Sequence, residues 1–297
     1  MTDTTQLTTT PKYRKQLNSE QLKVLNNLYV FRFLTSKQLA NYLGKKSRKD
    51  VQMRLRILED QGFIAKRYDK SYKLKGQPAA YYLLPEGART FARLSNRSPE
   101  TPVKVKAIYK DKDVSEHFIA HCMHIFDVFL QVRSHYLGKI EFFSRSHLNY
   151  EQFNYFPQPL PDGYIRLKIG NGIKRVFLDI FEDDQPFFVL IRRIKKYLEY
   201  ADDGEWPYSE TIPTILLVTD NKSMHKRLRK RIAYELRESY QTEARFATTT
   251  LQDLQDSTED KGKVWLPIDE HGDDKDDPTK PVTLSTLLLN RQPRIKG

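Results

Sequence analysis

The sequence predicts a two-domain α+β protein, and three observations lead to this expectation. The chain has 297 residues, 39% of them hydrophobic, which is enough for two folded cores. Residues 18–95 read as short amphipathic helices followed by two strands, whereas strands later alternate with helices. Positive charge is concentrated early in the chain. We therefore expect a basic domain over 18–95 and an α/β domain over 113–270, with a linker over 96–112, a flexible tail over 1–17, and an acidic loop and tail over 271–297.

The chain is organised around residues 35–62, which read as a short helix, a turn and a longer basic helix. Before them, a first helix is expected over residues 19–29, with Ser19 as its N-cap. The second helix begins at Thr35 and ends at Gly44, because glycine is suited to the left-handed conformation at a helix C-terminus.

The longer helix has an apolar face and a basic face. Val51, Leu55 and Leu58 recur at i, i+4 and i+7, so one stripe packs inward. Ser47 is the expected N-cap, and Asp50 makes a weak capping box with it. The basic face carries Arg48, Gln52 and Arg56, with Lys45, Lys46 and Lys49 around its start. Such a helix suits insertion into a DNA major groove, whereas the plainer alternative is a solvated amphipathic helix.

Two strands with a basic connection come next. They are expected from Phe63 onward and over residues 79–84, and a further helix starts at Pro85. The connection carries Lys66, Arg67, Lys70, Lys73 and Lys75. Three helices and a hairpin with a basic tip predict a winged helix-turn-helix. The run LEDQGFIAKR…YYLLPEGARTFA resembles the end of the recognition helix, the wing and the following helix of that fold. A winged helix can also be a protein-binding module.

The distribution of charge favours a polyanionic partner. Residues 11–110 hold 23 Lys and Arg against seven Asp and Glu, a surplus of 16, whereas residues 111–297 hold the remaining 27 against 30. A membrane is not expected, because no apolar run approaches about 18 residues and no signal-peptide pattern opens the chain. Cys122 is the sole cysteine, which excludes an internal disulfide and a thiolate zinc site. The simplest expectation is a cytoplasmic protein.

A long amphipathic helix is expected over residues 114–136. His117, His121 and His124 lie along one face of it at i, i+4 and i+7, a spacing at which histidines can share a metal. Only Asp127 is placed beside them as a further ligand, so packing against a neighbouring element is the more ordinary outcome and no metal is expected.

The second half reads as an α/β layer that begins with antiparallel strands. Strands are expected over 139–143, 164–169, 174–181, 214–219 and 244–248, and helices over 186–200 and 223–240. Asn171-Gly172 signals a hairpin, and the apolar run 212–218 is typical of a buried central strand. Residues 253–280 hold ten acids against four bases, which predicts a solvated loop.

The arrangement of two aspartates around the predicted hairpin resembles the core of the PD-(D/E)XK, restriction-endonuclease-like fold. Asp162 stands at a strand start and Asp179 in the next strand, where active members hold a divalent metal with two carboxylates. The lysine that the resemblance implies is replaced by Phe181. Residues that could substitute for the missing parts are Arg193, Lys195, Glu182 and Asp183. We therefore expect a degenerate domain without catalytic residues, in which Asp162 and Asp179 are remnants. Mg²⁺ would be needed only by an active nuclease.

Over nearly the whole chain from residue 18, the sequence is similar to the replication-relaxation family of plasmid- and mobile-element-encoded proteins. The matching stretches are HCMHIFDVFL at 121–130, PDGYIRLKIG…VFLDIFED at 161–183, RRIKKYLEY at 192–200 and RFATTTLQDL…KVWLPID at 245–269. The resemblance implies a winged-helix DNA binder fused to a degenerate nuclease-like domain, with a role in replication control or mobilisation.

These observations predict a sequence-preferring protein that binds double-stranded DNA, with no cofactor. The expected DNA-binding residues are Lys45, Lys46, Ser47, Arg48, Lys49, Gln52, Arg56, Lys66, Arg67, Lys70, Lys73 and Lys75. The alternatives are a metal-dependent nuclease, or an adaptor that recruits a relaxase or a replication initiator. A homodimer is possible because winged-helix binders often act as two-fold dimers.

Overall fold

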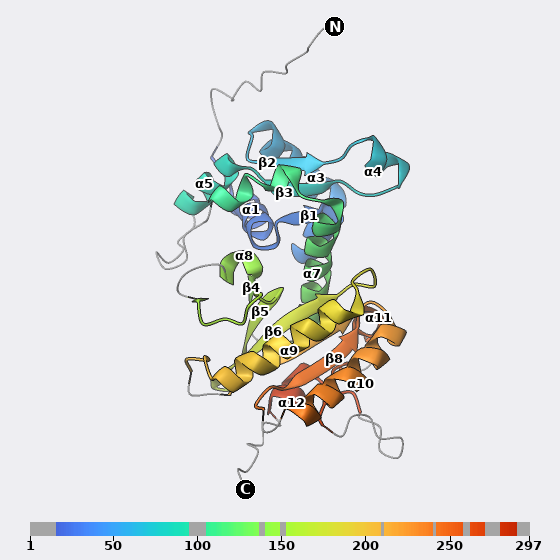
Figure 1. Ribbon diagram of the computed structural model, residues 1–297. Coiled ribbons are helices and arrows are strands. Elements are labelled where there is room, and N and C mark those ends of the chain that lie inside the picture. Colours follow the sequence, from blue (N-terminus) through green and yellow to red (C-terminus); the bar gives the residue numbers. More distant parts are fainter. Residues whose placement is uncertain are drawn as a thin grey trace. The chain divides into compact units, whose positions relative to one another are not determined.

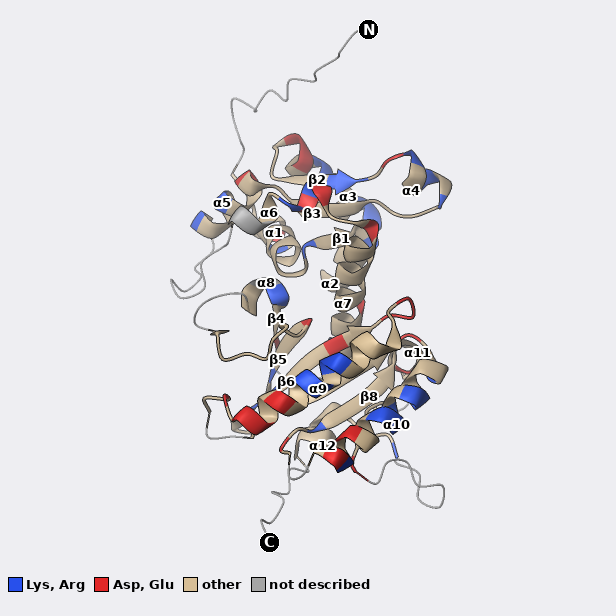
Figure 2. Ribbon diagram, in the orientation of Figure 1, with Lys and Arg blue, Asp and Glu red and all other residues tan. Residues whose placement is uncertain are grey.

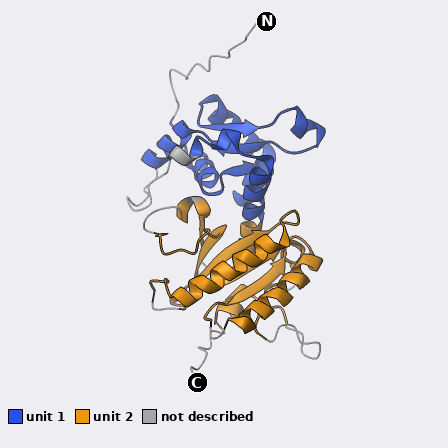
Figure 3. Cartoon of the chain, in the orientation of Figure 1, with its two compact units in different colours: residues 1–127 blue, residues 128–297 orange. Residues whose placement is uncertain are grey.

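The structure is a computed structural model in which the chain divides into two compact units, residues 1–127 and 128–297 (Figure 3). The residues that it describes are 16–94, 105–136, 140–148, 153–208, 211–239, 242–257, 262–270 and 280–289. The division falls within a single helix, α7 (Glu116–His135), which agrees with the long helix expected there.

Unit 1 combines helices with a small antiparallel sheet (Figure 1). Its elements are α1 (Ser19–Phe31), β1 (Phe33–Thr35), α2 (Ser36–Tyr42), α3 (Arg48–Asp60), β2 (Ile64–Arg67), α4 (Lys70–Leu74), β3 (Ala80–Leu83), α5 (Pro85–Leu94), α6 (Val105–Ile108), a 3-10 turn (Asp111–Asp113) and the first part of α7. In the sheet, β3 lies between β1 and β2. The hairpin expected from the sequence is therefore part of a three-stranded sheet, in which Phe33 of β1 pairs with Tyr82.

The helix caps of unit 1 differ in detail from those expected. Asn18, not Ser19, caps α1, and its side chain forms a capping box with Gln21. Thr35 caps α2 in the same way. Ser47 does cap α3, but it accepts a hydrogen bond from the amide of Lys49 and forms no capping box with Asp50. The start of α3 is thus fixed by a single side-chain hydrogen bond.

The described part of the expected linker, residues 105–112, is helical and packed. Within it Asp111 is 1% exposed and accepts a hydrogen bond from Nε of Arg32 at 3.1 Å. Arg32 has a φ of 65°, the single positive value among the described residues other than glycine, and its guanidinium lies 4.4 Å from the ring centroid of Phe118. The lack of apolar periodicity in the expected linker gave no sign of this buried ion pair.

Unit 2 is a six-stranded mixed sheet with helices (Figure 1). Its elements after α7 are β4 (Ile140–Ser144), α8 (Arg145–Leu148), β5 (Gly163–Ile169), β6 (Gly172–Phe181), α9 (Phe187–Asp203), β7 (Thr214–Thr219), α10 (Lys222–Glu238), β8 (Phe246–Thr250), α11 (Leu251–Asp256), β9 (Leu266–Ile268) and α12 (Leu284–Leu289). The strands follow in the order β4-β5-β6-β7-β8-β9. The pairs β6–β7 and β7–β8 are parallel and the other three are antiparallel, so α9 and α10 are crossover helices.

Two strand predictions can be compared directly with this sheet. Every residue of β7 is buried and it lies inside the sheet, as the apolar run indicated. The β5–β6 hairpin is present, but its two-residue turn is Gly170-Asn171 rather than Asn171-Gly172, since Ile169 pairs with Gly172. Gly170 takes the required positive φ of 58°.

The acidic segment 253–280 is not one solvated loop. It contains the end of α11 and the strand β9, and Trp265 beside that strand is 2% exposed. The tail expected over 271–297 includes α12, whose Leu288 is fully buried, while residues 271–279 and 290–297 lie outside the described part. Among the described residues, no helix has both the length and the apolar character needed to cross a membrane.

Candidate nucleic-acid interface and buried carboxylate pair

Helix α3 has a buried apolar stripe and an exposed, mainly polar side. Val51, Leu55 and Leu58 are fully buried. The exposed residues of this helix are Arg48, Lys49, Asp50, Gln52, Met53, Arg56, Ile57 and Asp60. The inward stripe therefore holds α3 in unit 1 through burial of three branched side chains, which leaves the polar side available to a ligand.

Two residues near the start of α3 are engaged within the protein to different degrees. Lys45 is half-buried and its Nζ lies 2.9 Å from Oε2 of Glu20. Hydrogen bonds from Lys23 and Lys45 lower the pKa of Glu20 to about 2. Lys46, in contrast, is exposed. Lys45 is consequently a weaker candidate for phosphate contact than its neighbour.

The expected basic wing also contains both engaged and available charges. Arg67 donates hydrogen bonds to the backbone carbonyls of Lys112 at 2.9 Å and Val114 at 3.1 Å, so its guanidinium links β2 to residues 112–114 of unit 1. Lys66 lies 2.9 Å from Glu59, and this hydrogen bond raises the lysine's pKa. The engaged side chains are thus less suited to DNA than the sequence suggested.

The connection between β2 and β3 contains the short helix α4, drawn with its lysines in blue in Figure 2. Lys70 and Lys73 are exposed there and form no ion pair within the described part of the chain. Lys75 is exposed and pairs with Glu116 at 3.2 Å. The sequence predicts only a basic connection here, and the helical turn fixes the backbone that carries these lysines.

An open hollow lies between the polar side of α3 and the sheet. It is lined by Gln52, Arg56, Glu59, Asp60, Lys66 and Tyr81. Glu59 and Asp60 bring negative charge to the C-terminal end of α3. Positive charge is therefore concentrated at the N-terminal half of this helix, where Arg48 and Lys49 lie.

Two exposed apolar residues, which were not predicted as functional from the sequence, lie on the same two helices as these bases. Met53 on α3 is 61% exposed and Leu74 at the end of α4 is 88% exposed. Met53 falls outside the stripe of Val51, Leu55 and Leu58, and that offset was a usable signal. Leu74 offered no such signal, because α4 is too short for a periodic pattern.

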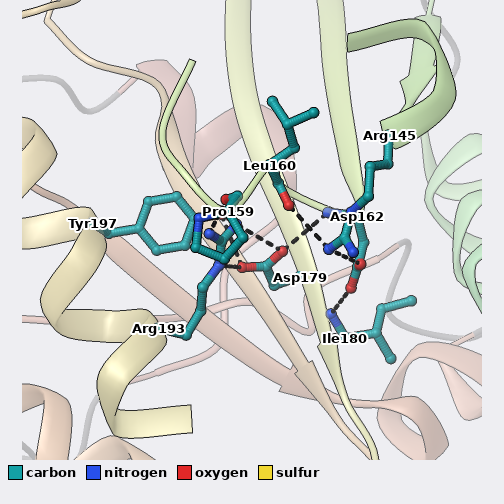
Figure 4. Close-up of polar contacts among 8 residues, drawn as sticks. All are labelled: Arg145, Pro159, Leu160, Asp162, Asp179, Ile180, Arg193 and Tyr197. Atoms are coloured by element: carbon teal, nitrogen blue, oxygen red, sulfur yellow. Dashed lines mark hydrogen bonds and ion pairs between the residues drawn. The ribbon is translucent and has the colours of Figure 1, made fainter. Parts of the chain in front are cut away.

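In unit 2, the two aspartates that the sequence singled out, Asp162 and Asp179, lie side by side (Figure 4). Gly163 at the start of β5 pairs with Leu178 of β6, which places Asp162 beside Asp179. The amide of Asp162 donates to Oδ1 of Asp179 at 3.0 Å, and the amide of Ile180 donates to Oδ2 of Asp162 at 3.0 Å. The two carboxylates are 5% and 3% exposed.

Arg193 of α9 and Tyr197 one turn later close the site on the side of Asp179. Nε of Arg193 lies 2.6 Å from Oδ2 of Asp179 and Nη2 lies 3.3 Å from Oδ1, a two-point contact. The hydroxyl of Tyr197 donates to Oδ2 at 2.9 Å. Burial lowers the pKa of Arg193, but attraction to the Asp179 carboxylate outweighs this effect, and the net result is a raised pKa. Burial raises the pKa of Tyr197 well above its ordinary value.

A second arginine reaches Asp162 from the other side. Nη2 of Arg145, at the start of α8, lies 3.0 Å from Oδ1 of Asp162 and also donates to the carbonyl of Leu160 at 3.0 Å. Arg193 completes the enclosure by donating to the carbonyl of Pro159. Two carboxylates and two guanidinium groups therefore neutralise each other in a network that α8, β6 and α9 hold in place.

These residues do not fit a divalent-metal site as they are arranged. Such a cation needs oxygen ligands free to coordinate it, whereas both oxygens of each carboxylate already accept hydrogen bonds. Phe181 is 5% exposed and belongs to the core. Among the residues considered as substitutes for the missing parts of the nuclease motif, Arg193 reaches Asp179 but acts as its counter-ion. Lys195 lies 3.7 Å from Glu235 instead. Asp183 accepts a hydrogen bond from Asn221 at 2.5 Å.

The histidines of α7 differ in exposure along the helix. His117 is exposed, and His121 and His124 are half-buried. Asp127, the acid beside them, accepts a hydrogen bond from Nε2 of Gln38 at 2.9 Å, and burial raises its pKa. This carboxyl thus ties α7 to α2 within unit 1.

Comparison with known proteins gives a family and two weak structural likenesses. Restriction endonuclease FokI bound to DNA has a TM-score of 0.26 and 13% sequence identity, and the alignment covers 79% of this chain and 43% of that chain. Restriction endonuclease FokI by itself gives a TM-score of 0.27 with the same identity and coverage. The chain thus matches under half of the length of these proteins, at a similarity too low to support any conclusion. No curated protein matches. The sequence model of the replication-relaxation family matches residues 25–215, from α1 into β7, and the chain belongs to this family.

Proposed function

We propose that this protein is a sequence-preferring binder of double-stranded DNA that acts in the replication control or mobilisation of a plasmid or mobile element. Unit 1 would be a winged helix-turn-helix domain in which α3 enters the major groove. The observation that carries the proposal is the division of α3 into a fully buried apolar stripe and an exposed side bearing Arg48, Gln52 and Arg56.

The dimensions of α3 suit this role. Arg48 and Arg56 are eight residues apart, which at about 1.5 Å per residue separates them by roughly 12 Å along the helix. That length covers about three to four base-pair steps of about 3.4 Å. Arginine can bind guanine and glutamine can bind adenine with two hydrogen bonds each, and Met53 can contact a thymine methyl group. Lys46 and Lys49 would bind the adjacent phosphates.

The test begins with selection of bound duplexes from a random pool, followed by fluorescence anisotropy on the selected site and on scrambled duplexes. Arg48→Ala with Arg56→Ala should reduce discrimination between them by about 1–3 kcal/mol for each lost two-point contact. The matched control is Arg89→Ala with Arg93→Ala on α5, which removes the same charge from exposed positions of the same unit. Equal discrimination by the α3 variant and wild type would refute the proposal.

We further propose that unit 2 is a degenerate nuclease-like domain that does not cut DNA. Support comes from the mutual neutralisation of Asp162 and Asp179 by Arg145 and Arg193. Supercoiled plasmid incubated with the protein and Mg²⁺ or Mn²⁺ should remain intact. Nicking that disappears in Asp179→Ala would instead establish the metal-dependent nuclease.

A further inference from the structure

Leu74 is the most exposed large apolar side chain in the described part of the chain, at 88%. It is the last residue of α4, at the tip of the β2–β3 connection. A leucine in this position gains almost nothing from burial within the folded protein, since the hydrophobic effect scales with the area removed from water. Its position therefore calls for a role outside the folding of unit 1.

The tip that carries Leu74 is a helical turn with hydrogen bonds at both of its ends. Asp69 caps α4, accepting hydrogen bonds from the amides of Ser71 at 2.8 Å and Tyr72 at 3.2 Å. At the other end Gly76 has a φ of 63°, and the amide of Gln77 donates to the carbonyl of Tyr72 at 2.8 Å.

One residue of the turn anchors it to the domain. Tyr72 is 5% exposed, and burial raises its pKa. The side chain two positions later, Leu74, is therefore held outward by a fixed backbone. A group that is already oriented loses less conformational freedom when it binds, so this construction favours a contact made by the tip.

The surroundings of Leu74 indicate what it contacts. Lys70, Lys73 and Lys75 are all exposed on the same turn, and Nζ of Lys73 lies 5.6 Å from the ring centroid of Tyr68, which is 44% exposed. Lysine is depleted from the centres of protein–protein interfaces, where larger apolar patches are usual. A single apolar side chain among cations instead matches proteins that insert a leucine between base pairs while lysines hold the flanking phosphates.

We propose that Leu74 is a wedge that enters the DNA minor groove, separates two stacked base pairs and bends the duplex. This inference rests on the proposed DNA binding and adds to it a second contact with a different physical basis. α3 discriminates between sequences by hydrogen bonds, whereas the tip selects steps that unstack easily, such as TA and CA/TG.

The experiment uses the full chain and the selected duplex, labelled at both ends for energy transfer and carrying 2-aminopurine at successive steps. Wild-type protein should shorten the end-to-end distance and raise the 2-aminopurine fluorescence at one step. Leu74→Ala should abolish both signals and weaken binding about tenfold, because it removes the buried wedge. Leu74→Phe should retain them. Leu94→Ala, at an exposed leucine of α5, is the matched control and should behave as wild type.

The outcomes separate this inference from the proposed function. Leu74→Ala that bends and binds the duplex like wild type overturns the wedge, even where Arg48→Ala with Arg56→Ala confirms base reading by α3. Loss of bending in Leu74→Ala supports the wedge, even where the α3 variant discriminates normally. Failure of wild type to bind any duplex overturns both. If the protein bound phosphatidylserine–phosphatidylcholine vesicles in a way that Leu74→Ala abolished, and did not bend DNA, the tip would be assigned to a lipid surface and the wedge overturned.

Discussion

Replacing Asp179 by alanine removes the acceptor at the centre of the buried network in unit 2. The substitution deletes the hydrogen bonds that the carboxylate accepts from the amide of Asp162, from two nitrogens of Arg193 and from the hydroxyl of Tyr197. Asp162 would remain as a second, more distant counter-ion. Arg193 is 8% exposed, so water cannot replace the lost partner without a change in packing.

The expected magnitude follows from the burial of both groups. Removing one partner of a buried ion pair typically costs about 3–5 kcal/mol, because an uncompensated charge stays in a poorly solvated place. Natural domains have about 5–15 kcal/mol of stability, so Asp179→Ala should bring unit 2 close to its unfolding threshold. In contrast, Asp179→Leu combined with Arg193→Met should recover most of the loss, since replacing a whole buried pair by apolar groups is often neutral.

Tryptophan fluorescence can measure this effect in unit 2 specifically. Both tryptophans, Trp206 and Trp265, lie in that unit and are buried. Urea unfolding of Asp179→Ala against wild type gives the predicted loss. The same measurement on Asp179→Leu, Arg193→Met and their double variant gives a coupling energy, which should exceed about 1 kcal/mol for groups in contact. Asp202→Ala, at an exposed position of α9, is the control and should change stability by under about 0.5 kcal/mol. Additive single effects, or a loss below about 1 kcal/mol for Asp179→Ala, would show that the network does not carry the charge balance described.

Three further predictions concern other parts of the fold. Gly87→Ala should cost unit 1 about 1–3 kcal/mol, measured by thermal unfolding with circular dichroism, because its new Cβ would lie 2.1 Å from the carbonyl oxygen of Phe63; an unchanged midpoint would contradict this packing. Gln38→Ala should cost about 1–3 kcal/mol in the same assay, because it removes the hydrogen bonds to Asp127 and to the carbonyl of Met123 together with the capping box at Thr35; a loss no larger than that of an exposed substitution would contradict these contacts. Burial lowers the pKa of His135 from its usual value of 6.5, so as pH falls the unfolded state takes up this proton before the folded state does. Unit 2 should therefore lose stability as pH falls from about 7.5 to about 5.5. In tryptophan-monitored urea unfolding, His135→Gln should reduce this dependence on pH, and an equal dependence in both proteins would refute the prediction.

Apolar periodicity was sufficient to predict the longer elements. The stripe of Val51, Leu55 and Leu58 placed α3 correctly, and the uninterrupted apolar run placed β7 inside the sheet. The shortest elements could not be predicted in this way. β1 and β9 have three residues each, and pairing with a neighbouring strand rather than their own pattern makes them strands.

The carboxylate site was only half predictable. Strand pairing brings Asp162 and Asp179 together, and the resemblance to nuclease-like proteins already identified both. The partners of these acids come from other elements, and no local spacing indicates that Arg145 and Tyr197 reach them. Long-range packing therefore decided the chemistry of this site.

Counting charge over residues 111–297 as a whole also concealed a feature of unit 2. Residues 187–197 of α9 and 222–231 of α10, the N-terminal parts of these helices, hold four and six Lys and Arg and no acid. The acids of unit 2 lie elsewhere, for example in residues 253–280, so the sum over the second half of the chain is close to neutral. Net charge therefore underestimates how strongly the helices of unit 2 are polarised.

The last strand of the six-stranded sheet constrains how copies of this protein can associate. β9 has only three residues, and its middle residue, Pro267, has no amide hydrogen to offer a further strand. Short edges containing proline resist addition of another chain, and proteins use them to avoid aggregation through open sheets. This edge is thus protected against the addition of a further strand from another copy of the protein.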